Sequence, residues 1–94
     1  MANVLQWFAS WVGAGADQLY PGQAHYWWMV GFNYGDAISL TAHPVIGPPV
    51  DRQLAVQDVR VEGTATGRTL LFTVRNVGPD PVPGYGIGFG FIRA

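Results

Sequence analysis

The sequence contains no cysteine and no lysine, and charged residues of any kind are scarce. The missing cysteine excludes a disulfide scaffold and a thiolate metal site. The five basic residues are arginines dispersed along the chain, so we expect no nucleic-acid partner. Charged residues make up 12% of the chain, against a usual share of about 25%. Much of the surface must therefore be apolar or neutral, and contiguous surface of that kind usually marks an interface.

Long hydrophobic runs are also missing. No apolar stretch approaches the roughly 20 residues of a membrane-spanning helix, so no membrane span is expected. Residues 4–16 have the apolar character of a secretion signal, but residues 1–3 carry no basic side chain, so we expect no signal peptide. Apolar residues nevertheless form 49% of the 94 residues, which is ordinary for a globular protein. The length predicts one domain over residues 1–94.

Side chains that alternate with period two predict β-strands over most of the chain. The strand patterns, separated by turn-forming residues, are 24–32, 38–43, 54–61, 70–75 and 85–91. We therefore predict an all-β fold, a small antiparallel immunoglobulin-like β-sandwich of about six or seven strands. The alternation predicts a core that contains Leu70, Phe72 and Val74 with Ile38, Leu40, Ile87 and Phe89.

Two segments depart from simple alternation. The apolar residues of 54–61 change face at Gln57-Asp58, and a β-bulge there would restore one buried face. Residues 3–12 fit a helical stripe as well as a strand, and we favour the strand because the rest of the chain is β. Such an N-terminal strand would pair either within its own chain or with the sheet of a neighbour.

The segment "LAVQDVRVEG" followed by "GRTLLFTVRNVGPDPVPGY" resembles the second half of CARDB-like and related immunoglobulin-like bacterial adhesion modules. The resemblance covers residues 54–92 and includes a strand that ends in Arg-Asn-Val-Gly. It implies a β-sandwich used outside the cell or at its surface, usually without catalysis. It transfers no site residues, and the aromatic first part of the chain lies outside it.

Nucleophiles and their usual partners are few. The histidines are His25 and His43, and the serines are Ser10 and Ser39. Neither serine has the Gly-x-Ser-x-Gly context of a nucleophile elbow, so we expect no catalytic residue and no enzyme. His25, His43 and Asp36 match no recognised ligand spacing, so neither a metal nor another cofactor is expected.

Three glycines, Gly86, Gly88 and Gly90, share one face of the predicted strand 85–91. Glycine in a strand costs backbone entropy and packs no side chain, so another group should approach that face closely. Either an aromatic side chain such as Trp27 or Trp28 lies across the glycines, or the face forms a shallow groove for a ligand or a second subunit.

The chain contains four tryptophans, more than a core of this size needs. Surplus aromatic residues serve at the centre of subunit interfaces, or stack on sugar rings beside polar groups. The candidate ligand or interface residues are therefore Trp7, Trp11, Trp27, Trp28, Tyr34, Asn33 and Asp36, with the three glycines of strand 85–91.

These features favour a non-catalytic binding or assembly module, a β-sandwich that self-associates into a homo-oligomer through aromatic and glycine-rich surfaces. The alternative is a small lectin-like protein whose exposed tryptophan and tyrosine rings bind a glycan. The sequence leaves the ligand, the oligomeric state and the secretion route open.

Overall fold

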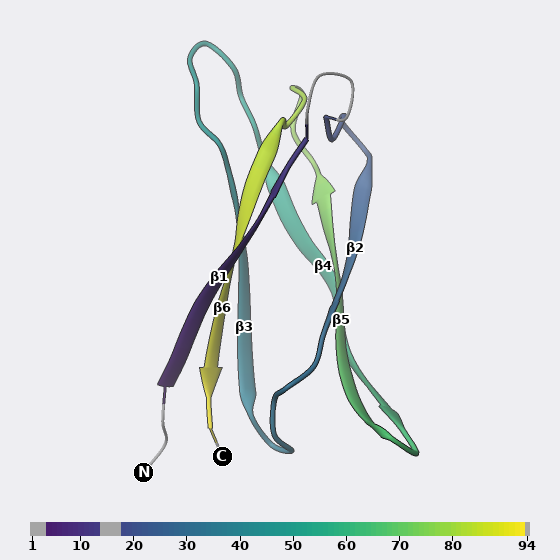
Figure 1. Cartoon of the computed structure of the whole chain (residues 1–94). Helices are drawn as coiled ribbons and strands as arrows, with labels where there is room; N and C mark the ends of the chain where they lie inside the picture. The colour runs from purple at the N-terminus through teal and green to yellow at the C-terminus, as the bar shows by residue number, and fades with distance from the viewer. Residues whose placement is uncertain (1–3, 14–17, 94) are drawn as a thin grey trace.

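The structure, a computed structural model, describes residues 4–13 and 18–93; the side chains of Val4, Leu5 and Trp7 lie outside this description. Six strands form two three-stranded antiparallel sheets that face each other (Figure 1). The strands are β1 (Val4–Val12), β2 (Ala24–Met29), β3 (Ala37–Pro44), β4 (Leu54–Thr64), β5 (Gly67–Asn76) and β6 (Gly84–Ile92). The predicted all-β sandwich is confirmed, with six strands among the described residues.

The first sheet has the order β1-β6-β3, and the second has the order β2-β5-β4. The N-terminal segment is a strand, as we favoured, and β1 pairs with β6 of its own chain along its whole length. Ala9 and Trp11 pack against the core, whereas Phe8 and Val12 are exposed. The candidate Trp7 pairs with Phe89 through its backbone, but its side chain lies outside the described part of the chain.

The core lies between the sheets and follows the predicted alternation. The predicted residues Leu70, Phe72, Val74, Ile87 and Phe89 are buried, together with Leu19, Val82, Tyr85 and Phe91. Ile38 and Leu40 are partly buried against this cluster. The predicted strand phase is therefore confirmed, because polar neighbours in these strands point away from the core.

The predicted bulge in β4 is also confirmed. The register with β5 shifts between Gln57 and Arg60, and Asp58 has a φ of 54°. The prediction for residues 24–32 was wrong at its end, because β2 stops at Met29. Gly31 has a φ of 97°, which redirects the chain, so Phe32 packs against the core instead of sharing the outer face of β2.

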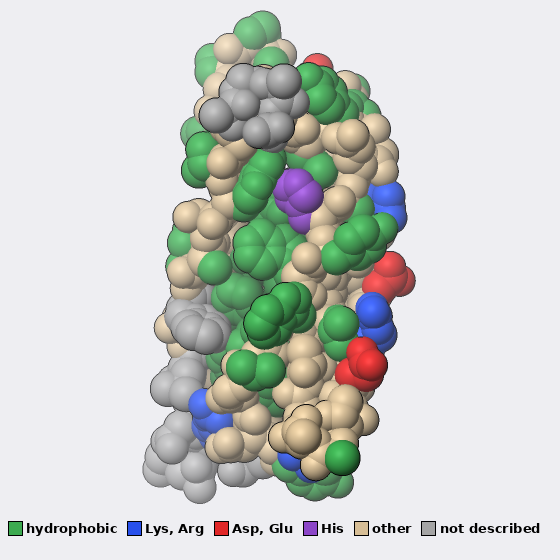
Figure 2. Space-filling model, turned by 45° about the vertical axis from the view of Figure 1, so that its right-hand side comes forward, with side chains coloured by type: hydrophobic (Ala, Val, Ile, Leu, Met, Phe, Trp, Pro, Cys, Tyr) green, Lys and Arg blue, Asp and Glu red, His purple; other side chains and the backbone are tan. Residues whose placement is uncertain are grey.

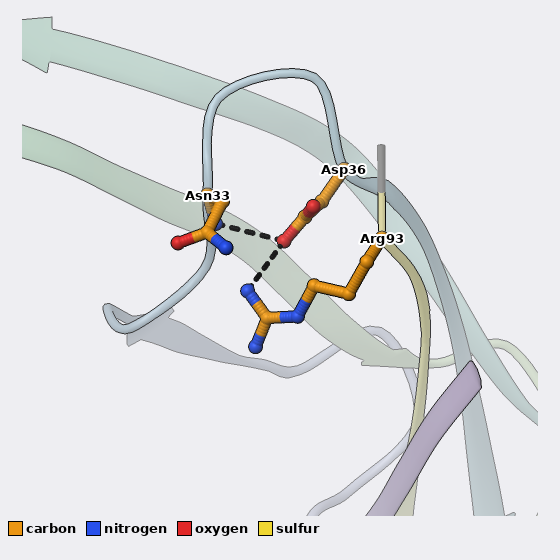
Figure 3. A network of polar contacts seen from close by, with 3 residues as sticks. All are labelled: Asn33, Asp36 and Arg93. Carbon is orange, nitrogen blue, oxygen red and sulfur yellow. Dashed lines mark hydrogen bonds and ion pairs between the residues drawn. The ribbon is translucent and has the colours of Figure 1, made fainter. Parts of the chain in front are cut away.

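A polar network closes the loop between β2 and β3 onto the C-terminal end of β6 (Figure 3). The Asp36 carboxylate accepts hydrogen bonds from the backbone N–H of Asn33, at 2.7 Å, and from Arg93 Nη1, at 2.8 Å. The Asp36 side chain is fully buried. A charge removed from water in this way is tolerated only because it is paired, so the network is structural.

Candidate functional site

The two sheets approach each other unequally along their two sides. On one side β3 packs closely against β4. On the other side, among the described residues, β1 and β2 meet through the rings of Trp11 and His25. We call the β1–β2 side the open edge. Both of its strands are outermost in their sheets, so each presents backbone N–H and C=O groups that no other described strand pairs with.

Neither strand of the open edge contains Asp, Glu, Lys or Arg. Natural proteins usually block edge strands with charges, prolines or bulges. The strand β4 has two of these features, a bulge at Asp58 and the charged residues Arg60 and Glu62. At the other end of the first sheet, β3 ends in Pro44 and lies against β4. The open edge is therefore the side that can accept another strand.

Aromatic side chains line the open edge from inside. Trp11, Trp27 and Met29 point towards the core but are only partly buried. The Trp27 ring stacks on Phe72 with 6.4 Å between ring centroids. Figure 2 shows hydrophobic side chains gathered around one histidine near the middle of the view, with charged side chains along the right-hand edge. This side of the molecule thus keeps accessible apolar surface, a feature that is typical of interaction sites.

A hydrogen-bonded cluster joins the two sheets at the open edge. The hydroxyl of Tyr85, on β6, accepts a hydrogen bond from Trp27 Nε1 at 2.9 Å and lies 2.6 Å from His25 Nδ1. The Trp11 and His25 rings pack edge to face, with 4.4 Å between centroids. Trp27 and His25 both lie on β2, so one hydroxyl from the first sheet holds two side chains of the second.

Burial shifts both titratable groups of this cluster towards their neutral forms. Desolvation lowers the pKa of His25, because an imidazolium ion would lose hydration there. Desolvation also raises the pKa of Tyr85, and the hydrogen bond from Trp27 partly opposes that change. The pair is therefore suited to linking the sheets as uncharged groups.

The outer face of β2 carries two more aromatic residues. Tyr26 is 81% exposed and Trp28 is 69% exposed. They lie two residues apart on one face of the strand, a separation of about 6.6 Å from the strand rise. Their cross-strand partners on β5 are Thr73 and Leu71. The two rings therefore form an exposed aromatic pair directly beside the open edge.

The remaining candidates near Tyr34 are not gathered into one site. Tyr34 is exposed in the turn before β3, and the Arg68 guanidinium lies 4.7 Å from its ring centroid. Asn33 is exposed in the same turn. Asp36 differs from these two exposed residues, because its carboxylate is buried and paired with Arg93. The Asp36 carboxylate is thus engaged in the loop network, and its role as a polar ligand contact stays a prediction.

The glycine face is covered by neighbours from its own sheet. A side chain on Gly86 would collide with the Phe8 ring. A Cβ on Gly88 would lie 2.8 Å from Thr41 Oγ1, and one on Gly90 would lie 2.6 Å from Ser39 Oγ.

The idea that Trp27 or Trp28 lies across these glycines was wrong, because both belong to the other sheet. Trp27 points into the core and Trp28 points to solvent. A shallow groove of about 400 Å³ remains beside Gly88 and Gly90.

Sequence reasoning missed His25 and Tyr85 as partners, since they lie 60 residues apart. A signal was present, because Tyr85 is the one residue of its predicted face with a polar end, and a buried tyrosine hydroxyl requires a hydrogen-bond partner.

The second histidine, His43, lies on the outer face, 2.9 Å from Thr41 Oγ1. Within the described ranges, no three His, Asp or Glu side chains are grouped to hold a metal ion.

Within residues 4–13 and 18–93, no helix is long and apolar enough to cross a membrane. No protein-family model, curated protein or solved structure matches the chain.

Proposed function

We propose that this protein is a non-catalytic assembly module that self-associates by pairing edge strands along the open edge. The observation that carries the proposal is the pair of uncharged edge strands β1 and β2, on the side where the backbones of the described strands pack less closely than β3 and β4 do. In the proposed assembly, β1 of one copy pairs antiparallel with β1 of another about a twofold axis. The first sheet would then continue as six strands through two molecules.

Two properties of the open edge support this arrangement. The strand β1 has nine residues, which is long for an edge strand and offers an extended ladder of backbone hydrogen bonds. The partly buried Trp11 and Trp27 would lose their remaining water contact when a second copy covers the edge. Aromatic residues of this kind are enriched at the centres of protein interfaces.

A matched pair of lysine substitutions tests the proposal. Ser10 and Ser39 are both exposed, and they lie on the outer face of the same sheet, on β1 and β3 respectively. Ser10→Lys places a charge beside the proposed pairing line, where edge lysines block association. Ser39→Lys adds the same charge on the far strand.

Light scattering at increasing protein concentration measures the mass of each variant. We expect assembly of the wild type and of Ser39→Lys, and a single-chain mass for Ser10→Lys. Equal masses for the two variants would contradict pairing through β1, and a monomeric wild type would contradict self-association altogether.

A second candidate function is glycan binding, which the exposed pair Tyr26 and Trp28 favours. Flat aromatic rings offer an apolar face to the C–H face of a sugar ring. Titration calorimetry with soluble oligosaccharides tests this candidate, with Trp28→Ala as the variant that should lose binding. Tyr34→Ala, which removes an exposed ring from the turn before β3, is the control that should keep it.

The likeness of residues 54–92 to CARDB-like modules stays a prediction, and so does a location at the cell surface. Both agree with an assembly role, since adhesion modules act through their surfaces. Neither the proposed pairing nor glycan binding involves a reaction step.

A further inference from the structure

The hydrogen bonds around Tyr85 assign the protonation state of His25. Trp27 Nε1 is only a donor, so it uses the Tyr85 oxygen as an acceptor. The hydroxyl proton of Tyr85 then needs an acceptor of its own, and His25 Nδ1 lies 2.6 Å away. Both donors at this contact, Trp27 Nε1–H and the Tyr85 hydroxyl, are satisfied when His25 is neutral, with its proton on Nε2 and its lone pair on Nδ1.

Protonation of His25 would disrupt this arrangement. The imidazolium carries a proton on both ring nitrogens, so Nδ1–H and the Tyr85 hydroxyl proton would meet at one short contact. The hydroxyl would have to turn away, and Tyr85 is 1% exposed. Its proton would lose the acceptor in a site that water barely reaches, which is costly.

We propose that His25 is a proton-sensitive latch at the open edge: as the neutral imidazole it holds β2 to β6 through Tyr85, and its protonation releases the latch and dissociates the assembly. The proposal rests on the proposed function for its effect on association. The latch itself is a property of one chain.

The surroundings of His25 contain little else that titrates. From β6 it meets Tyr85, and from β1 it meets the Trp11 ring. On β5 it pairs with Val74, and Trp27 lies two residues further along β2. Tyr85 is therefore the one titratable group that these described contacts bring to the ring, and its own pKa is raised by burial. A proton taken up near neutral pH goes to the imidazole.

Proton linkage gives the expected size of the effect. Burial lowers the pKa of His25 below its ordinary value of about 6.5. Suppose that the pKa of His25 is one unit lower in the assembly than in the free chain. The dissociation constant then rises about tenfold once the pH is below both pKa values. Within the folded chain a proton favours the open latch, and we expect the assembly to weaken with it as the pH falls below about 6.5.

The test measures two quantities between pH 8 and pH 5 for the wild type, His25→Gln and His43→Gln. The first is the mass by light scattering, and the second is the thermal midpoint with tryptophan fluorescence as its signal. Glutamine at position 25 can accept the Tyr85 proton but cannot become charged. His43 lies on the outer face, so its replacement is the matched control.

We expect the wild type and His43→Gln to dissociate on acidification and His25→Gln to lose that dependence. A His25→Gln variant that keeps the wild-type pH profile would overturn the latch. If all proteins are single chains at every pH, the proposed function fails while the thermal midpoints still test the latch.

Nuclear magnetic resonance of the wild-type imidazole nitrogens provides a measurement that does not depend on a variant that folds. The latch requires a neutral ring with its proton on Nε2 at pH 7.5. A proton on Nδ1 at that pH would contradict it.

Discussion

Removal of the Tyr85 hydroxyl is the sharpest perturbation of the link between the sheets. Tyr85→Phe keeps the ring in the core but deletes the acceptor of Trp27 Nε1 and the hydrogen-bond partner of His25 Nδ1. An unpaired buried polar group costs about 1–3 kcal/mol. Trp27 and His25 are only partly buried, so we take about 1 kcal/mol for each unpaired group. The free energy of unfolding should therefore fall by about 2 kcal/mol.

Thermal unfolding followed by circular dichroism measures this loss. For a domain of this size, 1 kcal/mol corresponds to about 4–8 °C, so the Tm should fall by roughly 8–16 °C. Tyr26→Phe deletes the same atom from an 81% exposed side chain and should change stability by less than about 0.5 kcal/mol. Equal midpoints for the two variants would refute the reasoning that the hydroxyl joins the sheets.

The remaining predictions concern the core, the loop network and acid. Phe72→Ala deletes a ring that is 2% exposed and should cost about 3–5 kcal/mol, which urea unfolding measures; an unchanged midpoint would contradict the strand phase. Asp36→Ala leaves Arg93 and the Asn33 N–H without their acceptor and should cost about 1–3 kcal/mol, with Asp51→Ala as an exposed control. Burial lowers the pKa of His25, so the unfolded chain binds the proton at higher pH than the folded one. The free energy of unfolding should therefore fall as the pH drops below about 6.5, and by less in His25→Gln; urea titrations at pH 8 and pH 5 compare the two.

The strand pattern was predictable where one face alone was apolar. In β5, Leu70, Phe72 and Val74 alternate with outward residues, and the core follows that alternation. The bulge at Asp58 could be predicted for the same reason, since the apolar residues change face there. Alternation reports which side of a strand is buried, and it needs no knowledge of the partner strand.

The pairing of strands was not predictable from these patterns. The cover over Gly86 comes from Phe8, which the order β1-β6-β3 brings beside it. The contact between His25 and Tyr85 depends on how two sheets face each other. Asp36 looked like a surface residue because a turn contains it, and only the return of Arg93 at the end of the chain buries its charge.

Amide hydrogen exchange at several protein concentrations tests edge-strand pairing most directly, because it reports on the backbone groups of β1 themselves. Protection of the outward amides of residues 4–12 should rise with concentration, while the amides of β4, beyond the bulge at Asp58, should not change. Protection of β1 that is the same at every concentration, together with a mass of one chain, would contradict the proposal that this protein assembles through its open edge.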